Sequence, residues 1–352
     1  MSRIPLHDVI AQNRSIQQEL DAAWKAVNVS GQFINGPQVK QFQGDFSKYI
    51  GTDYCIGVGN ATDGFEIAFQ ALNLNAGDEV IIPANAHVSP ALAALKVGLK
   101  PIFCDVDEGR MLLNADTVSA QITERTKAIV AVHLYGRVCP MDELKQLCAE
   151  KNLMLIEDFS QAHGASFNGQ KVGSFGDVSV CSFYPTKPLG ALGDGGAILT
   201  SNPTLANKCR TLANYGWVGR DNVSLAGRNS RLDELQAAVL NVKLQYLDKW
   251  NAERLTKAKE LQQIIGDSIS DFQDGDVCHL FVLRSGEREE LKQFLLENGV
   301  DCQVHYPIPM HQQTLFNSEV DLPVAEKLCK QILSVPVNEK VAELLRQFNV
   351  IG

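Results

Sequence analysis

The lysine at position 187 lies in an unusual stretch of sequence. Aromatic residues, prolines and glycines surround it in the segment 182–196. Pro185 and Pro188 stiffen the chain, and the glycines allow a ligand to approach the backbone closely. A lysine in this setting can be desolvated and become a nucleophile, as Schiff-base chemistry requires. The structural alternative is an ordinary surface loop.

Two carboxylates end an apolar run earlier in the chain. Glu157 and Asp158 directly follow Leu155 and Ile156. Open α/β sheets bind ligands at the carboxyl ends of their strands, and a carboxylate there must be hydrated, paired or face a cation. Neighbouring residues of a strand point to opposite faces, so we expect only one of the two to serve a site. A helix cap or a surface loop is the alternative.

Glycines also occur where a phosphate could bind. Gly57 and Gly59 lie between a predicted strand and a predicted helix, and the N–H groups at a helix start attract phosphate. A dinucleotide fingerprint would need a third glycine at position 62, where this chain has Thr62, so a dinucleotide-dependent oxidoreductase is disfavoured. A tight turn without a ligand remains the alternative.

Two further segments are rich in polar side chains. Residues 227–236 place polar groups at the start of a predicted long helix, and residues 305–312 set His305, Tyr306 and His311 around prolines. Helix capping and a rigid turn explain them structurally. The histidines have no supporting spacing with carboxylates, so we expect no metal site.

An alternation of apolar runs and amphipathic stretches positions these groups. Seven runs predict strands, and they are residues 54–59, 79–83, 101–106, 128–134, 153–158, 177–183 and 197–200. Several are rich in Val and Ile and almost free of polar residues, as strands buried on both faces are. Helices are predicted between them, for example over 62–74 and 141–151. The fold class is therefore α/β with a largely parallel sheet.

The pattern changes after residue 230. Apolar residues at intervals of three and four predict one long helix over 231–261, with Ser230 as its N-cap. A strand over 279–284, a helix over 287–299 and a strand over 300–306 follow. We therefore expect a large domain over residues 1–240 and a small α+β domain over residues 241–352.

Composition limits the class of protein. The 352 residues are 45% hydrophobic, which excludes disorder for most of the chain, and 32 basic against 41 acidic residues leave a net charge of −9. No basic cluster suggests nucleic-acid binding. The nine cysteines form no CxxC pair, and neither a signal peptide nor a membrane span is visible. We expect a cytoplasmic protein with reduced cysteines.

In this order, the segments resemble the DegT/DnrJ/EryC1/StrS family of sugar aminotransferases. These are pyridoxal 5'-phosphate (PLP) enzymes of the aspartate aminotransferase fold, fold type I. The resemblance runs through Ser30–Pro37, Gly59–Asp63, Gly77–Pro83, Glu157–Ala165, Ser182–Gly196, Asn229–Gln236 and His305–His311. It implies a large domain with a mostly parallel seven-stranded sheet and a small C-terminal α+β domain.

The resemblance also implies residue roles. Lys187 matches the lysine that binds the cofactor covalently and moves protons, and Asp158 matches the carboxylate facing the pyridine nitrogen. Gln161 matches a residue beside the ring hydroxyl. The other cofactor contacts implied are Ala61, Thr62, His87, Ser182 and Asn229, and those implied for the sugar nucleotide are Tyr184, Arg228, His305, Tyr306 and His311. Asn229 matches a residue that reaches the neighbouring subunit, which implies a homodimer with shared sites.

The implied reaction is transamination from L-glutamate to a keto-sugar on a nucleoside diphosphate, for lipopolysaccharide, O-antigen, glycan or antibiotic biosynthesis. The version of the phosphate turn at Gly59–Asp63 favours a dTDP-linked 3-keto-6-deoxyhexose, followed by a 4-keto or UDP-linked sugar. Two departures are Pro188, where the family often has asparagine, and Arg228, where tyrosine or histidine is common. A PLP-dependent lyase or dehydratase is one alternative, although Lys187 argues against the dehydratase branch, and a non-catalytic regulatory relative is another.

Overall fold

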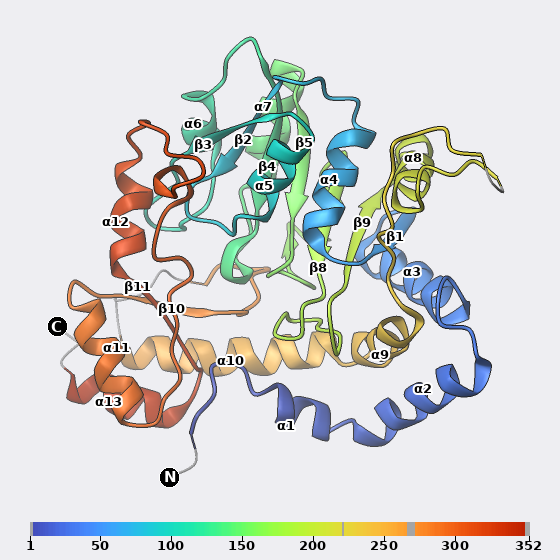
Figure 1. Cartoon of the computed structure of the whole chain (residues 1–352). Coiled ribbons are helices and arrows are strands. Elements are labelled where there is room, and N and C mark those ends of the chain that lie inside the picture. The colour runs from blue at the N-terminus through green and yellow to red at the C-terminus, as the bar shows by residue number, and fades with distance from the viewer. Residues whose placement is uncertain (1–2, 220–221, 266–271, 349–352) are drawn as a thin grey trace.

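The computed structural model describes residues 3–219, 222–265 and 272–348 of the chain (Figure 1). A seven-stranded sheet forms its centre. The strands are β1 (Tyr54–Val58), β2 (Glu79–Pro83), β3 (Lys100–Cys104), β4 (Thr126–Val132), β5 (Met154–Asp158), β8 (Val178–Ser182) and β9 (Gly196–Thr200). Each of the seven apolar runs of the sequence corresponds to one of these strands. The predicted α/β class is therefore confirmed.

The order of strands across this sheet is β1-β9-β8-β5-β4-β2-β3. Strand β9 runs antiparallel to both of its neighbours, while the other pairings are parallel. All five residues of β2 and of β9 are buried, as expected for strands covered on both faces. The prediction of a mostly parallel seven-stranded sheet is thus confirmed.

Helices cover the sheet and extend along its base (Figure 1). Those of the N-terminal and central parts are α1 (Val9–Arg14), α2 (Gln17–Ser30), α3 (Pro37–Ile50), α4 (Ala61–Ala71), α5 (Ser89–Lys96), α6 (Ala115–Ser119), α7 (Met141–Lys151) and α8 (Pro203–Ala213). A short hairpin of β6 (Ser166–Phe167) and β7 (Gln170–Lys171) follows β5. Apolar residues from both layers meet in one large core that encloses the sheet.

The C-terminal part has a smaller core of its own. Its elements are α9 (Glu234–Leu244), α10 (Leu247–Ile265), β10 (Phe281–Arg284), α11 (Arg288–Glu297), α12 (Pro323–Gln331), β11 (Ile332–Val335) and α13 (Glu339–Gln347). Strands β10 and β11 pair antiparallel, and Figure 1 shows α11 and α13 at the far end of α10. The domain boundary after residue 240 stays a prediction.

The single helix predicted over 231–261 is wrong. The chain forms two helices, α9 and α10, and the last turn of α9 tightens through three-residue hydrogen bonds from Gln245 N–H to the Val242 carbonyl and from Tyr246 N–H to the Lys243 carbonyl. Neither glycine nor proline marks this break, so the local sequence carries no signal for it.

Two smaller predictions in this region are also wrong. Ser230 does not cap α9, because its hydroxyl donates to the Asp63 carboxylate at 2.7 Å and accepts from the Gly59 N–H at 3.0 Å. Residues 300–306 form no strand. They pair with neighbouring segments only through two isolated bridges, from Val300 to Ile4 and from Gln303 to Ser334. The strand that pairs with β10 is β11, which the sequence analysis did not predict.

None of the helices among the described residues is long and apolar enough to cross a membrane. The nine cysteines are all buried and unpaired. Within the same described ranges, no group of His, Cys, Asp and Glu side chains has the geometry to hold a metal ion.

Candidate active site

A cavity of about 930 Å³ opens at the carboxyl ends of the parallel strands. Ten of the residues singled out in the sequence line it, and they are Ala61, Thr62, His87, Asp158, Gln161, Ser182, Tyr184, Lys187, His305 and Tyr306. Asp158 ends β5, Ser182 ends β8 and Ala61 begins α4. Strands and helix ends from distant parts of the sequence therefore meet where open α/β sheets bind their ligands.

The two neighbouring carboxylates of β5 face opposite sides, as the alternation of a strand predicts. Asp158 lines the cavity, and among the described residues only the Ser160 N–H donates to its carboxylate, at 3.0 Å. Glu157 is fully buried away from the cavity. Asp158 is therefore the carboxylate that can meet a ligand, and Glu157 has a different role.

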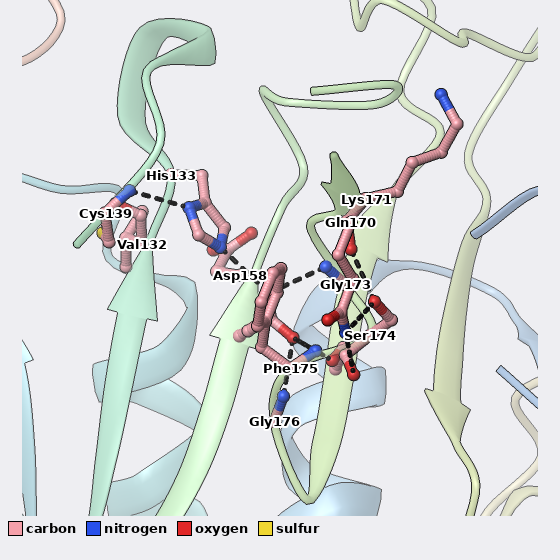
Figure 2. A network of polar contacts seen from close by, with 12 residues as sticks. Val132, His133, Cys139, Asp158, Gln170, Lys171, Gly173, Ser174, Phe175 and Gly176 are labelled. Carbon is pink, nitrogen blue, oxygen red and sulfur yellow. Dashed lines mark hydrogen bonds and ion pairs between the residues drawn. The ribbon is translucent and has the colours of Figure 1, made fainter. Parts of the chain in front are cut away.

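Glu157 is the centre of a buried hydrogen-bond network, and Figure 2 shows its partners Gly173, Phe175 and Gly176. One of its oxygens accepts from the N–H groups of Phe175 at 2.7 Å and Gly176 at 2.8 Å and from the Ser179 hydroxyl at 3.0 Å. The other accepts from the Gly173 N–H at 2.7 Å and from His133 Nε2 at 3.1 Å. The charge is thus shared among five donors, which link β5 to the loop before β8 and to the end of β4.

These contacts determine the ionisation of Glu157 and of its partner His133. Burial opposes a charge on Glu157, but the hydrogen bonds from His133 and the backbone outweigh it and lower the pKa of the carboxyl. His133 Nδ1 accepts from the Cys139 N–H at 3.1 Å, so its other nitrogen carries the proton donated to Glu157. The His133 N–H also donates to the Asp158 carbonyl at 2.9 Å, which ties this network to the cavity wall.

Lys187 lies in the loop between β8 and β9. Its N–H donates to the Tyr184 carbonyl at 2.8 Å, and the Leu189 N–H donates to His163 Nδ1 at 3.3 Å. Burial lowers the pKa of the Lys187 amine, and the negative charge of Asp158 partly opposes this effect. The loop therefore presents an amine that loses its proton more readily than a solvated lysine does, beside an ionisable carboxylate.

The start of α4 forms another wall of the cavity. Asn60 caps this helix by accepting from the Asp63 N–H at 2.8 Å, which leaves the N–H groups of Ala61 and Thr62 directed to the helix end. Gly196 of β9 passes so closely that a Cβ there would be 2.7 Å from the Asn60 carbonyl carbon. Glycine at this position is what allows the strand to pack against the helix start.

Histidines and a tyrosine complete the cavity. His87 Nδ1 lies 2.8 Å from the Ser89 hydroxyl, and its ring meets the Tyr306 ring edge-on at 5.6 Å. Burial and repulsion from Lys187 lower the pKa of His305 to about 4. Gln161 accepts from the Tyr135 N–H at 2.7 Å and hydrogen-bonds to Tyr306. These contacts hold the rings of His87 and Tyr306 in fixed positions in the cavity wall.

Three of the residues predicted for the site lie outside this cavity. Arg228 directs its guanidinium to Asp63 and Glu66 of α4, at 3.0 Å from the Asp63 carboxylate. Asn229 forms a backbone bridge with Asn214. His311 is buried and its Nε2 lies 3.1 Å from the Glu326 carboxylate. Arg228 and His311 therefore do not line this chain's cavity, and their contacts with a ligand stay predictions.

The sequence analysis also missed residues that line the cavity. The N-terminal segment contributes Arg3, Leu6 and His7, and the segment just before β10 contributes His279. The rings of His7 and His279 stack with their centres 5.0 Å apart. These residues belong to no motif with a characteristic spacing, so only the folded chain brings them to the site.

The residues of the cavity fit PLP. The Lys187 amine, the Asp158 carboxylate and the capped start of α4 line one cavity. They supply a nucleophile, a carboxylate for a protonated ring nitrogen and N–H donors for a phosphate. His87 adds an aromatic face. This donor set does not suit a metal ion, because it lacks the clustered ligands that metals require.

Known proteins that resemble this chain in sequence are aminotransferases or are named as regulatory proteins. The sequence profile of the DegT/DnrJ/EryC1/StrS aminotransferase family matches residues 14–345. The chain is 38% identical over 345 residues to the dTDP-3-amino-3,4,6-trideoxy-alpha-D-glucose transaminase of Streptomyces venezuelae, covering 95% of this chain and 91% of that protein. It is 38% identical over 369 residues to a pleiotropic regulatory protein of Geobacillus stearothermophilus, covering 98% and 99%. It is 36% identical over 337 residues to the UDP-2-acetamido-2-deoxy-3-oxo-D-glucuronate aminotransferase of Pseudomonas aeruginosa, covering 94% of each.

Two crystal structures share the fold over the whole chain. DesV of Streptomyces venezuelae, in complex with a ketimine intermediate, superposes with a TM-score of 0.94 at 36% identity, covering 100% of this chain and 98% of that chain. NtdA of Bacillus subtilis, with bound cofactor PMP, superposes with a TM-score of 0.91 at 30% identity, covering 100% and 86%.

Proposed function

Because the chain belongs to the DegT/DnrJ/EryC1/StrS aminotransferase family, we propose that it transfers an amino group from L-glutamate to a keto-sugar carried on a nucleoside diphosphate. The family resemblance inferred from the motifs is confirmed, and so is the class of enzyme, a sugar aminotransferase. The substrates, the cofactor contacts and the oligomeric state are proposals.

The observation that carries the proposal is the meeting of Lys187 and Asp158 in one cavity. PLP bound there would supply an electron sink for a carbanion at the carbon that gains or loses the amino group. Asp158 would hold the proton on the ring nitrogen, which is what makes the ring accept electrons. A relative of the same fold holds PMP, the aminated form of this cofactor.

The chain's own residues divide the remaining tasks. The N–H groups of Ala61 and Thr62, with Ser182, would bind the phosphate, and His87 would stack on the ring. Gln161 is fixed by its hydrogen bonds to Tyr135 and Tyr306 and would contact the ring hydroxyl. These contacts would hold the reacting carbon beside Lys187.

Lys187 would then move the proton. Its amine is buried, and burial lowers its pKa, so it releases a proton more readily than a solvent-exposed lysine. A base whose pKa lies nearer to neutral pH is better suited to take a proton from the donor carbon, hold it on Nζ and release it again. Lys187 is therefore the catalytic base and acid of both half-reactions.

A dTDP-linked 3-keto-6-deoxyhexose is the first choice of acceptor. The turn at Gly59–Asp63 favours a 3-keto sugar, and one relative at 38% identity is a dTDP-sugar transaminase. A relative at 36% identity acts on a UDP-linked 3-oxo sugar, so the UDP carrier is the second choice, and a 4-keto sugar the third. Tyr184, His305 and Tyr306 line the cavity and would contact the sugar.

A homodimer with shared sites accounts for Asn229. This residue lies outside its own chain's cavity, and the chain exposes apolar side chains that include Ile34 (46% exposed), Trp217 (41%) and Val218 (53%). Exposed apolar groups of this size mark protein interfaces. We propose that Asn229 reaches the cofactor phosphate of the partner subunit. A mixture of Lys187→Ala and Asn229→Ala variants, each inactive alone, should then regain activity through hybrid dimers.

An absorption spectrum with added PLP tests the reaction. The wild-type protein should develop a yellow band that L-glutamate bleaches, and Lys187→Ala should show neither the band nor the bleaching. Absence of the band in the wild-type protein would overturn the cofactor assignment. Keto-sugars on dTDP and UDP should then be compared for their ability to restore the band to the glutamate-treated enzyme.

The same experiment separates the two alternatives. A lyase or dehydratase would release ammonia or water without consuming L-glutamate. A regulatory protein, the class to which one relative at 38% identity is assigned by name, would show no turnover with any keto-sugar. The intact Lys187 and Asp158 favour the aminotransferase over both.

A further inference from the structure

A second cavity, of about 600 Å³, joins the first at Lys187. Lys187, His7 and His279 line both cavities, whereas Arg254 lines only the second. Residues of the N-terminal segment and of α10 line it, and Figure 1 shows that the segment before α1 passes beside α10. The segment is held in place by hydrogen bonds of Ile4, whose N–H donates to the Gly299 carbonyl at 2.8 Å. The second cavity is therefore a built extension of the active site on the side away from Asp158.

Arg254 is fixed so that part of its guanidinium remains available. Its Nε donates to the Cys278 carbonyl at 3.2 Å, and one terminal nitrogen donates to the Asn251 side-chain oxygen at 2.6 Å. Across residues 3–219, 222–265 and 272–348, no carboxylate forms an ion pair with Arg254, and its other terminal nitrogen has no hydrogen-bond partner. A largely buried cation without a counter-ion is costly, so this arrangement favours an anionic ligand.

The charges around Arg254 support the same conclusion. The two acidic residues that line the second cavity, Asp8 and Glu253, are exposed, and so are two basic ones, Arg3 and Lys257. The charges of these four exposed residues roughly cancel. The buried positive charge of Arg254 therefore remains without an ion-pair partner in the interior of the second cavity.

His7 and His279 are suited to contact the ligand as neutral rings. Burial, with repulsion from His305, Arg254 and Lys187, lowers the pKa of His7 to about 4. Burial, with repulsion from the surrounding cationic side chains, also lowers the pKa of His279 far below its usual value. At neutral pH these stacked rings can donate and accept hydrogen bonds without adding charge.

We propose that Arg254, with His7 and His279, binds the side-chain carboxylate of a dicarboxylic amino acid, the amino donor. An amino acid whose nitrogen reaches Lys187 would extend its side chain into the second cavity, because Lys187 lines both cavities and Arg254 only the second. A planar carboxylate suits one guanidinium edge, whereas a diphosphate would bring several negative charges to a single buried arginine. This inference rests on the proposed transamination and assigns its donor specificity.

The test compares L-glutamate with its neutral analogue L-glutamine in the first half-reaction. In Arg254→Gln, the half-saturating concentration of L-glutamate should rise about 10- to 100-fold, since a hydrogen bond to a charged group is lost. The half-saturating concentration of L-glutamine should stay within about 2-fold, because its amide never required the charge. Arg254→Lys should recover part of the selectivity.

Arg288→Gln is the matched control. Arg288 also lies on a helix of the smaller part and donates to a backbone carbonyl, that of Cys329 at 2.9 Å, but it lines neither cavity. It should leave the preference for L-glutamate unchanged. Equal weakening of both donors in Arg254→Gln, or the same loss in Arg288→Gln, would overturn the proposal.

A binding measurement keeps this inference separate from the proposed reaction. Glutarate, which has no amino group, should bind to the PLP-treated wild-type protein in a calorimetric titration and should bind at least about 10-fold more weakly to Arg254→Gln. If the wild-type enzyme aminates no keto-sugar but glutarate binding still depends on Arg254, the reaction fails and the carboxylate pocket stands. Binding of inorganic phosphate or dTDP in place of glutarate at this arginine would overturn the pocket assignment.

Discussion

Replacing Glu157 by glutamine tests the buried network beneath the active site. The substitution keeps the shape of the side chain but removes its charge and turns one acceptor oxygen into a donor. If the amide oxygen takes the place that accepts from Phe175, Gly176 and Ser179, the new NH₂ group faces the Gly173 N–H and His133 Nε2. Donor then meets donor in a fully buried position.

The expected loss follows from these contacts. Two hydrogen bonds to a charged acceptor disappear, each worth about 1.5–3 kcal/mol. The free energy of unfolding should therefore fall by about 3–6 kcal/mol, a large part of the stability of an ordinary domain. Urea and thermal unfolding, with the transition midpoint followed by circular dichroism, measure the difference.

The control is Glu150→Gln, an exposed carboxylate whose contact is the Gln146 amide at 2.8 Å. It removes the same charge and should change stability by less than about 0.5 kcal/mol. A fall in the free energy of unfolding of less than about 1 kcal/mol in Glu157→Gln would refute the idea that the charge of this carboxylate stabilises the network.

The pH dependence gives a second check. The pKa of Glu157 is lowered in the folded protein from its usual value of 4.5, so the unfolded chain binds the proton first as the pH falls. Its contribution to stability is fully present above about pH 4.5 and is lost as the pH falls through the folded pKa. The gap between wild type and Glu157→Gln should therefore be widest near neutral pH and narrow in acid.

Four further substitutions test other parts of the protein. Gly196→Ala places a methyl group 2.7 Å from the backbone just ahead of α4 and should raise the dissociation constant for PLP, measured by fluorescence titration. Gly44→Ala, with nothing within 4 Å, should instead stabilise α3 by about 0.5–1 kcal/mol. Arg228→Ala leaves the buried Glu66 carboxylate (2% exposed) facing one exposed lysine and should lower stability by about 1–3 kcal/mol in urea unfolding; an unchanged midpoint would contradict this. His163→Leu should destabilise by about 1–3 kcal/mol, and because burial lowers the pKa of His163 from 6.5 to about 3, its deficit relative to wild type should shrink as the pH falls below 6.5. A deficit that grows in acid would show that the histidine is charged in the folded state.

The local sequence pattern was sufficient to predict most strands of the sheet. The run over 79–83 matches β2, and the amphipathic stretch over 141–151 matches α7, residue for residue. Strands buried on both faces must be apolar at nearly every position, so each one leaves a readable signal in its own few residues.

The C-terminal part was harder to predict, because its elements are set by contacts between distant segments and leave no such local signal. The helix break after Leu244 and the failure of residues 300–306 to form a strand depend on which segments pack alongside. Ser230 resembles an N-cap in the sequence, but its hydroxyl is taken by Asp63, a residue of α4. Local propensity is overridden when a distant partner offers a better contact.

The sequence by itself determined the family and the class of enzyme and predicted the roles of Lys187 and Asp158, because motif order and residue type are local properties of the chain. Only the tertiary structure decided which carboxylate of the 157–158 pair faces the cavity and that Arg228 pairs with α4. It alone also brought His7 and Arg254 beside Lys187 to form a second cavity. Such contacts join residues far apart in the sequence, and they follow from how helices and strands pack, which no short pattern records.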